Sequence, residues 1–368
     1  MSTLFTPVNL GALTLPNRIV IAPMCQYSSQ DGNANAWHLM HLGQLAFSGA
    51  GMLITEATAV EADGRISAQD LGLWSDANEQ ALASTLAAVR QHSAMPIAVQ
   101  LAHAGRKASV IPPWLGGQLR PSAAGGWRTW APSPLPFSPG NEAPLALDAA
   151  GLKRIRDAFA AAAVRAARAG FDAVELHAAH GYLLHQFLSP LSNRREDAYG
   201  GSLENRMRFP LEVFEAVRAA FPPARPVGAR VSATDWVAGG WDLAQTTVFA
   251  AALKARGCDF LDVSSGGLSP QQQIPLSPGY QVPFAEHLKK EVGMPTIAVG
   301  LITEARHAES IVADGQADMV ALARGILYDP RWPWHAAAEL GAQVDAPPQY
   351  WRCQPRELKS LFRDARQG

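Results

Sequence analysis

Cysteine is scarce in this sequence, and its spacing argues against two common stabilising frameworks. The three cysteines, Cys25, Cys258 and Cys353, are odd in number, far apart and never part of a CxxC pair. A disulfide framework and a structural zinc site both need closer, paired cysteines. We therefore expect neither, and we predict no metal ligands elsewhere in the chain.

The sequence also has neither a strong excess of positive or negative residues nor a long uninterrupted apolar run. The 31 Lys and Arg nearly balance the 32 Asp and Glu, and no basic block occurs, so nucleic-acid binding is not expected. The N-terminus lacks a basic segment followed by an apolar run, and the Ala-rich stretch 159–170 is interrupted by Arg165 and Arg168. Neither a secretion signal nor a membrane span is expected. We predict a soluble, cytoplasmic protein without membrane partners.

Eight short apolar runs alternate with helical patterns along the chain. The runs are 18–23, 51–58, 96–102, 172–178, 226–232, 259–265, 295–300 and 319–324. Helices are expected from Asp148 as N-cap to Gly170, over 202–221 and over 243–256. Eight strands alternating with helices predict a parallel sheet closed into a barrel.

A doubly wound sheet is the rival fold, but the turn after the first run, PMCQYSSQDG, lacks the GxGxxG pattern of that fold. The predicted fold class is α/β: a single (β/α)₈ TIM barrel over residues 1–368, with an N-terminal β-hairpin and long loops at its C-terminal face. Two segments, 103–147 and 266–280, are too long for plain connections. Because both follow strands, they are expected to be lids or binding loops at the face where barrel active sites lie.

The fourth strand and its loop contain a His-x-x-His-x-Tyr cluster. Alternation places Val174 and Leu176 toward the helices and His177 into the barrel, with His180 and Tyr182 on the following loop. Two imidazoles can donate hydrogen bonds to a carbonyl or nitro oxygen, and a phenol can deliver a proton. The same residues are also compatible with structural histidines or with a zinc pair that lacks an obvious third ligand.

The last two strands end in residues suited to an anion. Gly300 and Gly325 allow a ligand to approach the backbone closely, and Arg324 supplies a guanidinium that can donate two parallel hydrogen bonds. Loops after the seventh and eighth strands of such barrels often bind phosphate. We predict a phosphate site there, the alternative being a plain glycine turn.

Three other residues at strand ends suit a flat heterocycle. Gln100 offers a donor and an acceptor to a pyrimidine edge. Arg230 lies within a strand, where an unpaired cation is costly, so it needs either an electron-rich ligand or an interior carboxylate such as Glu56 or Glu175. Cys25 is compatible with contact to a cofactor edge and equally with simple packing.

Taken together, these motifs resemble the Old Yellow Enzyme family of FMN-dependent ene-reductases. The resemblance runs from LFTPVNLGALTLPNRIVIAPMCQYS through VQLAHAGR, HGYLLHQFLSPLSNRREDAYGGSLENR and ARVSATDW to VGLIT and ALARGILYDP, nearly the whole chain. Cys25, the His177 and His180 pair, and the terminal QYWR are similar to the thermophilic-like, or xenobiotic-reductase, subgroup. Leu301 stands where some members have tryptophan, which leaves the size of the substrate pocket open.

The resemblance implies a role for each matching position. Residues around the flavin ring would be Pro23, Met24, Cys25, Ala57, Gln100 and Arg230, and those around its phosphate would be Gly300, Arg324 and Gly325. His177 and His180 would bind the substrate oxygen, Tyr182 would be the proton donor, and Tyr27 would contact substrate. The segment 345–368 would reach a neighbouring subunit, with Arg352 acting in trans in a homodimer or homotetramer, although Trp351 is an alternative for the crossing side chain.

The implied activity is reduction of activated C=C bonds in enones, enals, maleimides and nitroalkenes. NADPH or NADH would reduce FMN, flavin N5 would pass hydride to Cβ, and Cα would be protonated. Three other functions are open: a flavoprotein that binds or senses without turnover, a metal-dependent barrel hydrolase built on His177 and His180, and a Schiff-base aldolase. The aldolase is the weakest, since of six lysines only Lys107 lies just beyond a strand.

Overall fold

The computed structural model describes residues 2–363, and its centre is a closed barrel of eight parallel strands. The barrel strands are β3 (Ile19–Ile21), β4 (Met52–Ala59), β5 (Ile97–Ala102), β8 (Ala173–Ala178), β9 (Val227–Ser232), β10 (Leu261–Ser264), β11 (Thr296–Ala298) and β12 (Met319–Leu322). Around the barrel their order is β10-β11-β12-β3-β4-β5-β8-β9. The prediction of an eight-stranded (β/α)₈ barrel is confirmed, and each predicted run contains one strand, with β4 extending one residue further.

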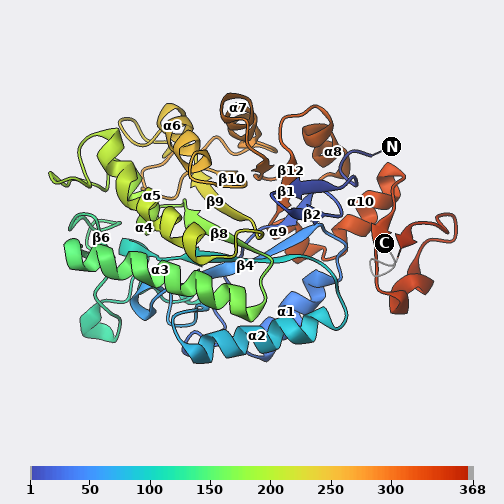
Figure 1. The fold of residues 1–368 in the computed structure, drawn as a ribbon, viewed down its shortest axis with the longest axis horizontal. Coiled ribbons are helices and arrows are strands. Elements are labelled where there is room, and N and C mark those ends of the chain that lie inside the picture. The colour runs from blue at the N-terminus through green and yellow to red at the C-terminus, as the bar shows by residue number, and fades with distance from the viewer. Residues whose placement is uncertain (1, 364–368) are drawn as a thin grey trace.

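Helices cover the outside of this barrel (Figure 1). They are α1 (Ala36–Ala46), α2 (Asp76–Arg90), α3 (Ala149–Ala169), α4 (Leu183–Leu188), α5 (Leu203–Ala220), α6 (Leu243–Lys254), α7 (Val282–Val292), α8 (Ala305–Ala313), α9 (Arg324–Tyr328) and α10 (Trp332–Leu340). The predicted ends of α3 are confirmed: Asp148 caps it by accepting from the Gly151 N–H, and Gly170 ends it at a φ of 96°. No helix among residues 2–363 is long and apolar enough to cross a membrane.

Short strands and 3-10 turns complete the chain. The strands are β1 (Val8–Leu10), β2 (Leu13–Leu15), β6 (Trp130–Ala131), β7 (Leu145–Ala146), β13 (Val344–Asp345) and β14 (Phe362–Arg363); the 3-10 turns are η1 (Ala62–Gly64), η2 (Gly105–Lys107), η3 (Pro113–Leu115), η4 (Ser122–Ala124) and η5 (Pro348–Cys353). The predicted N-terminal hairpin is β1 paired with β2. Its Leu10 and Leu15 pack with inward-facing barrel residues such as Val20 and Phe260, so the hairpin closes the N-terminal end of the barrel.

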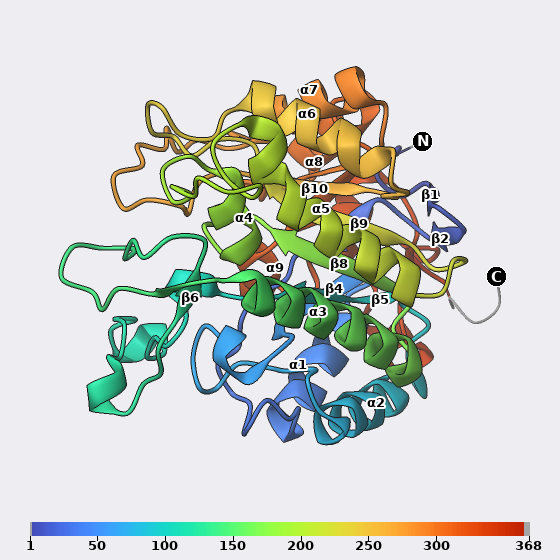
Figure 2. The ribbon, with the colours of Figure 1, turned by 60° about the vertical axis from the view of Figure 1, so that its left-hand side comes forward.

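The two long segments lie at the opposite end. Residues 103–147 contain η2, η3, η4, β6 and β7, and residues 266–280 follow β10. Both project on the same side of the molecule as α4, away from β1 and β2 (Figure 2). Because the hairpin packs against the N-terminal end of the barrel, we expect a ligand to approach the barrel interior from the side of these loops.

Candidate active site

The His-x-x-His-x-Tyr cluster lies where β8 ends and α4 begins. His177 is 3 % exposed, and its ring stands edge-on to the rings of His180 and Tyr182, at centroid distances of 5.2 and 4.9 Å. His180 has a φ of 56°, a left-handed conformation that residues other than glycine seldom adopt. The three side chains predicted to act together are therefore brought together by one strained turn.

Hydrogen bonds fix the orientation of the two imidazoles. The Ala179 N–H donates to His177 Nδ1, so the proton of a neutral His177 is on Nε2. His180 Nε2 lies 2.7 Å from the Ser264 hydroxyl, which is 3.3 Å from Gln281 Oε1. The Ser264 proton can go to Gln281 Oε1, which also accepts from Ser265 at 2.6 Å, or to His180 at the shorter distance. In the second case the proton of His180 is on Nδ1, 3.4 Å from His177 Nε2. Two N–H groups then face one point, where an acceptor oxygen would satisfy both.

Burial keeps all three groups in their neutral forms. Desolvation, with help from the nearby Arg230 cation, lowers the pKa of His177 and His180 well below the usual range. Desolvation raises the pKa of Tyr182 well above its ordinary value. The site thus offers neutral imidazole donors beside a phenol that retains its proton.

Residues from three other strands meet Tyr182 in one apolar cluster. Its buried members include Ala57 and Ala102, and Cys25 and Tyr27 pack against it together with Tyr182. Tyr27 has a φ of 49°, again left-handed. Desolvation raises the pKa of the Cys25 thiol well above its usual value, so it stays protonated. Pro23 and Met24 immediately precede Cys25 at the end of β3.

Polar side chains line the barrel interior below this cluster. The Gln100 amide donates to Glu175 Oε1 at 2.8 Å, and the other Glu175 oxygen is buried without a partner. Arg230 Nε lies 3.1 Å from Asp262 Oδ2. The interior carboxylate beside Arg230 is therefore Asp262, whereas the sequence had suggested Glu56 or Glu175. Within residues 2–363 Arg230 makes no hydrogen bond, so its terminal nitrogens remain available to a ligand.

The residues predicted to bind an anion lie at the ends of β11 and β12. Gly300 has a φ of 127°, and the start of α9 brings Arg324 next to Gly325, around whose Cα the space is open. Arg324 is exposed and pairs with no carboxylate among residues 2–363; it is close enough to Tyr280 to act on that phenol electrostatically. An unpaired guanidinium beside accessible glycine backbone is suited to a phosphate.

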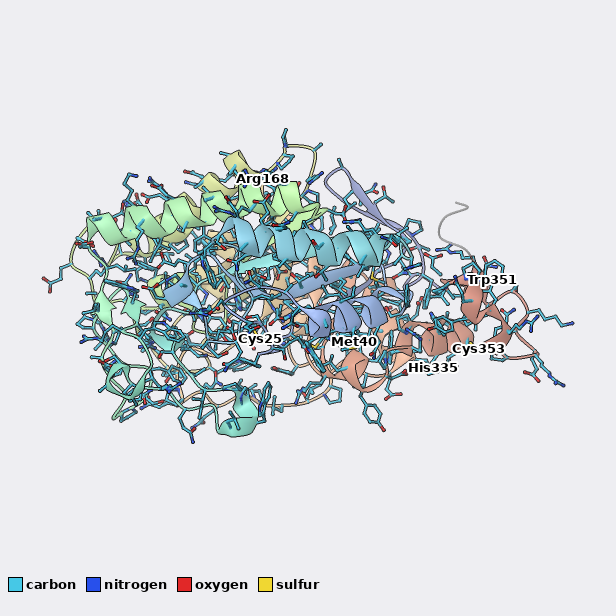
Figure 3. The ribbon with its side chains drawn as sticks, turned by 90° about the horizontal axis from the view of Figure 1, so that it is seen from below. Cys25, Met40, Arg168, His335, Trp351 and Cys353 are labelled. Atoms are coloured by element: carbon cyan, nitrogen blue, oxygen red, sulfur yellow. The ribbon has the colours of Figure 1, made fainter. Side chains whose placement is uncertain are left out.

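Arg352 does not join this site within its own chain. It lies in η5 and is exposed. Figure 3 shows its neighbours Trp351 and Cys353 well to one side of Cys25. The Trp351 indole donates to the Ala346 carbonyl, which holds η5 against β13. Participation of Arg352 in a site would require a second subunit, and its action in trans stays a prediction.

Several residues at the site were missed in the sequence. Asp262 and Ser264 belong to β10 and contact Arg230 and His180, respectively. Gln281, just before α7, contacts Ser264. The serines in DFLDVSS, at the end of a predicted strand, were the available signal. In the described part of the chain no group of three His, Cys, Asp or Glu side chains is placed to hold a metal, so a zinc ion on His177 and His180 would lack a third ligand.

The family of the chain follows from comparison with known proteins. Residues 3–343 match the model of the NADH:flavin oxidoreductase / NADH oxidase family. The chain belongs to this family. It is an Old Yellow Enzyme-type oxidoreductase, as the resemblance implied.

Curated members of the family are similar over nearly their whole length. The chain is 44 % identical to an NADPH dehydrogenase of Geobacillus thermodenitrificans, covering 95 % of this chain and 98 % of the relative. It is 42 % identical to the NADPH dehydrogenase of Bacillus subtilis, with the same coverage of each chain.

Solved structures agree with the fold. Morphinone reductase matches with a TM-score of 0.77 at 32 % identity, covering 100 % of this chain and 98 % of that one. The same enzyme in complex with tetrahydroNAD matches with a TM-score of 0.76 at 31 % identity, covering 100 % and 99 %.

The cofactor of this family member is FMN, with a nicotinamide coenzyme as its redox partner. The residues present fit a flavin on two observations. The terminal nitrogens of Arg230 and one oxygen of Glu175 have no hydrogen-bond partner among residues 2–363, and Glu175 is bonded to Gln100 through its other oxygen. At the other end, Arg324 lies unpaired beside the open glycine backbone. The first set suits a polar ring edge and the second a phosphate.

Proposed function

We propose that this oxidoreductase is an NADPH-dependent ene-reductase that acts on activated C=C bonds of enones, enals, maleimides and nitroalkenes. The observation that supports it most strongly is the packing of the His177 ring against both His180 and Tyr182, which brings two neutral imidazoles and one protonated phenol together. An activated alkene needs both functions, because negative charge develops on its oxygen and a proton must reach Cα.

Each predicted residue has a place in this proposal. His177 and His180 bind the carbonyl or nitro oxygen, and Tyr182 holds the proton for Cα at its Oη. A bound FMN would supply the hydride for Cβ, with the nicotinamide coenzyme as its source. Residues proposed to hold the ring are Pro23, Met24, Cys25, Ala57, Gln100 and Arg230, and those for its phosphate are Gly300, Arg324 and Gly325.

Substrate would enter the site through a cavity of about 380 Å³, which is lined by Tyr27 and Tyr182 among others. This volume is suited to a small organic molecule. We also propose that Arg352 completes the pocket of a neighbouring subunit in a cytoplasmic homodimer or homotetramer.

The spectrum of the purified protein tests the proposal. We expect a yellow protein whose flavin absorbance bleaches when NADPH is added without oxygen and returns when cyclohexenone follows. Yellow protein that NADPH does not bleach would favour the flavoprotein without turnover. Protein that stays colourless after incubation with FMN would overturn the assignment.

A further inference from the structure

Two adjacent cations lie beside the proposed active site without a counter-charge. Arg106 and Lys107 form most of η2, directly after β5, and both line the 380 Å³ cavity together with Tyr27 and Tyr182. Neither makes an ion pair with any carboxylate among residues 2–363. Placing two positive charges side by side in a mostly apolar wall is unfavourable unless an anion joins them.

Lys107 is held in place by backbone carbonyls and aromatic rings. Its Nζ donates to the carbonyls of His180 and Gly267, at 2.8 and 2.9 Å. It also lies 4.8 Å from the ring centre of Phe137 and 4.9 Å from that of Tyr182. Two of its three protons are thus used by carbonyls, which leaves one N–H for a ligand. Burial and the neighbouring Arg106 lower the pKa of Lys107 to about 8, so it is mainly charged at pH 7.

Arg106 is more deeply buried and equally short of negative charge. It is 6 % exposed, and its Nε has no hydrogen-bond partner. Its terminal nitrogens donate to the carbonyls of Leu135, Pro136 and Leu268, which lie in the two long loops. The nearest carboxylate acting on it, Asp235, is already bound by His185. The positive potential of the pair is therefore directed at the cavity.

We propose that this cavity contains an anion subsite, with Lys107 as the direct ligand and Arg106 as a fixed supporting charge. The inference rests on the proposed function and adds a ligand class to it: a small molecule whose apolar part lies on the cavity wall and whose anionic oxygen group contacts Lys107. Ile66, Val110, Leu119 and Phe137 supply that wall. Two sources share this chemistry, a carboxylate on the alkene and the 2′-phosphate of NADPH.

Calorimetry on the FMN-bound protein at pH 7 tests the carboxylate source. The probes are 4-hydroxybenzoate and 4-hydroxybenzamide, which differ in charge but hardly in shape. We expect the wild type to bind the benzoate about tenfold more tightly, as a charge-assisted hydrogen bond gives. Lys107→Met should bring the ratio of the two Kd values close to one, whereas Lys107→Arg should keep it. Lys254→Met, which removes a lysine bound to the Val292 carbonyl elsewhere, should not change the ratio.

Stopped-flow reduction of the flavin tests the phosphate source. If NADPH supplies the anion, the ratio of the Kd values for NADH and NADPH should fall about tenfold in Lys107→Met, while the benzoate ratio changes little. A fall of either Kd ratio in Lys107→Met supports the subsite. A fall of the benzoate ratio identifies a carboxylate as its ligand, and a fall of the NADH to NADPH ratio identifies the phosphate. The subsite is overturned if the wild type binds the amide as tightly as the benzoate and NADH as tightly as NADPH. This outcome does not depend on whether the variants fold. Reduction of neutral cyclohexenone is measured separately, so failure of the proposed function remains distinguishable.

Discussion

At the scale of single residues, the chemistry of the site depends on keeping groups neutral. His177 and His180 are deprived of water and lie near Arg230, so protonating them would create unpaired buried charge. As neutral rings they can direct N–H groups at one oxygen without attracting a counter-ion. Tyr182, in the same surroundings, cannot ionise easily and so remains a proton donor.

Replacing the Tyr182 hydroxyl should separate the two halves of the reaction. In Tyr182→Phe we expect reduction of the flavin by NADPH to stay within about threefold of the wild type, because no proton from Tyr182 is needed there. Reoxidation by cyclohexenone should slow by roughly 10²–10⁴-fold, the range typical of a positioned acid. Stopped-flow absorbance measures both halves. Equal rates of reoxidation in variant and wild type would remove Tyr182 from its proposed role.

The sequence indicates candidate site residues but not the contacts that connect them. Arg230 was recognised as needing a partner, yet Asp262 pairs with it only because the two residues lie opposite each other in the register of β9 and β10. Glu56, the carboxylate first considered, lies at an irregularity between β4 and β5, accepts from the Gln26 N–H and approaches His38. Strand positions follow from apolar runs, whereas register and bulges depend on packing between distant segments.

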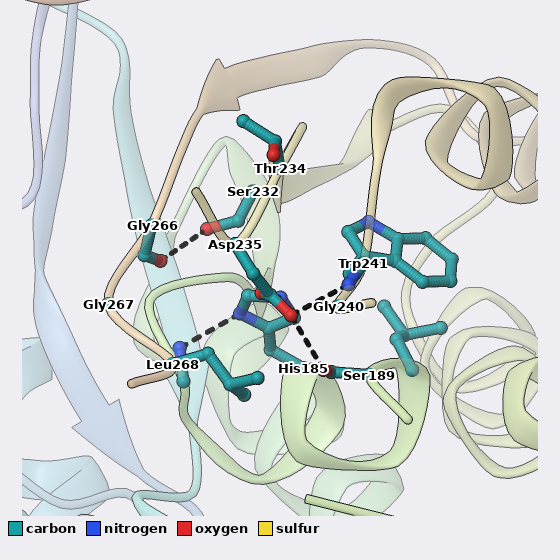
Figure 4. Close-up of polar contacts among 12 residues, drawn as sticks. His185, Ser189, Ser232, Thr234, Asp235, Gly240, Trp241, Gly266, Gly267 and Leu268 are labelled. Carbon is teal, nitrogen blue, oxygen red and sulfur yellow. Dashed lines mark hydrogen bonds and ion pairs between the residues drawn. The ribbon is translucent and has the colours of Figure 1, made fainter. Parts of the chain in front are cut away.

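At the scale of elements, the turn that contains His180 is anchored by a buried polar network (Figure 4). The Gly181 N–H donates to His185 Nδ1, and His185 Nε2 lies 3.0 Å from Asp235 Oδ1, both side chains being inaccessible to solvent. The other Asp235 oxygen accepts from Ser189 and from the Trp241 N–H. The loop after β9 is thereby tied to α4, and through α4 to the turn that presents His180 and Tyr182.

Breaking this anchor should reduce stability in a pH-dependent way. In Asp235→Asn the amide N–H₂ must face a group that donates a hydrogen bond to the carboxylate in the wild type, so two donors would oppose each other. We therefore expect the free energy of unfolding at pH 7 to fall by about 3 kcal/mol or more. Burial by itself would raise the pKa of Asp235, but His185 and the hydrogen bonds from Ser189 and Trp241 outweigh it and lower the pKa overall. Because the folded-state pKa lies below the unfolded value of about 3.9, the ionised group stabilises the fold above that pH and less in acid.

Urea unfolding of the FMN-bound proteins, at pH 7 and again below pH 4, measures the effect. The difference in the free energy of unfolding between Asp235→Asn and the wild type should be smaller below pH 4 than at pH 7. Asp157→Asn, which removes an exposed partner of Lys153, is the matched control and should change little at either pH. If this difference in unfolding free energy were the same at both pH values, the charge of Asp235 would not be what stabilises the fold.

At the scale of the whole molecule, the chain builds one barrel and leaves η5 on its surface, while residues 364–368 of the predicted crossing segment lie outside the described residues. Large apolar side chains are exposed on η5, α1 and α9; they are Tyr350, Trp351, Trp37, Met40 and Tyr328. Exposed apolar groups of this size are typical of contact surfaces between subunits. This arrangement is consistent with the predicted oligomer, in which Arg352 would reach a neighbouring site.

Mixed subunits can decide whether Arg352 acts in trans. Tyr182→Phe and Arg352→Ala should each be impaired alone, the first in its own site and the second in the site of its neighbour. In a hybrid dimer one site combines both defects, while the other has Tyr182 from one subunit and Arg352 from its partner. We therefore expect the hybrid, refolded or co-expressed and purified with two different tags, to recover about half of the wild-type rate per dimer with cyclohexenone. If Arg352 acted only within its own chain, each site of the hybrid would keep one defect and no activity would return. Since the two residues lie far apart in one chain, recovery can arise only where the end of one subunit meets the barrel mouth of another.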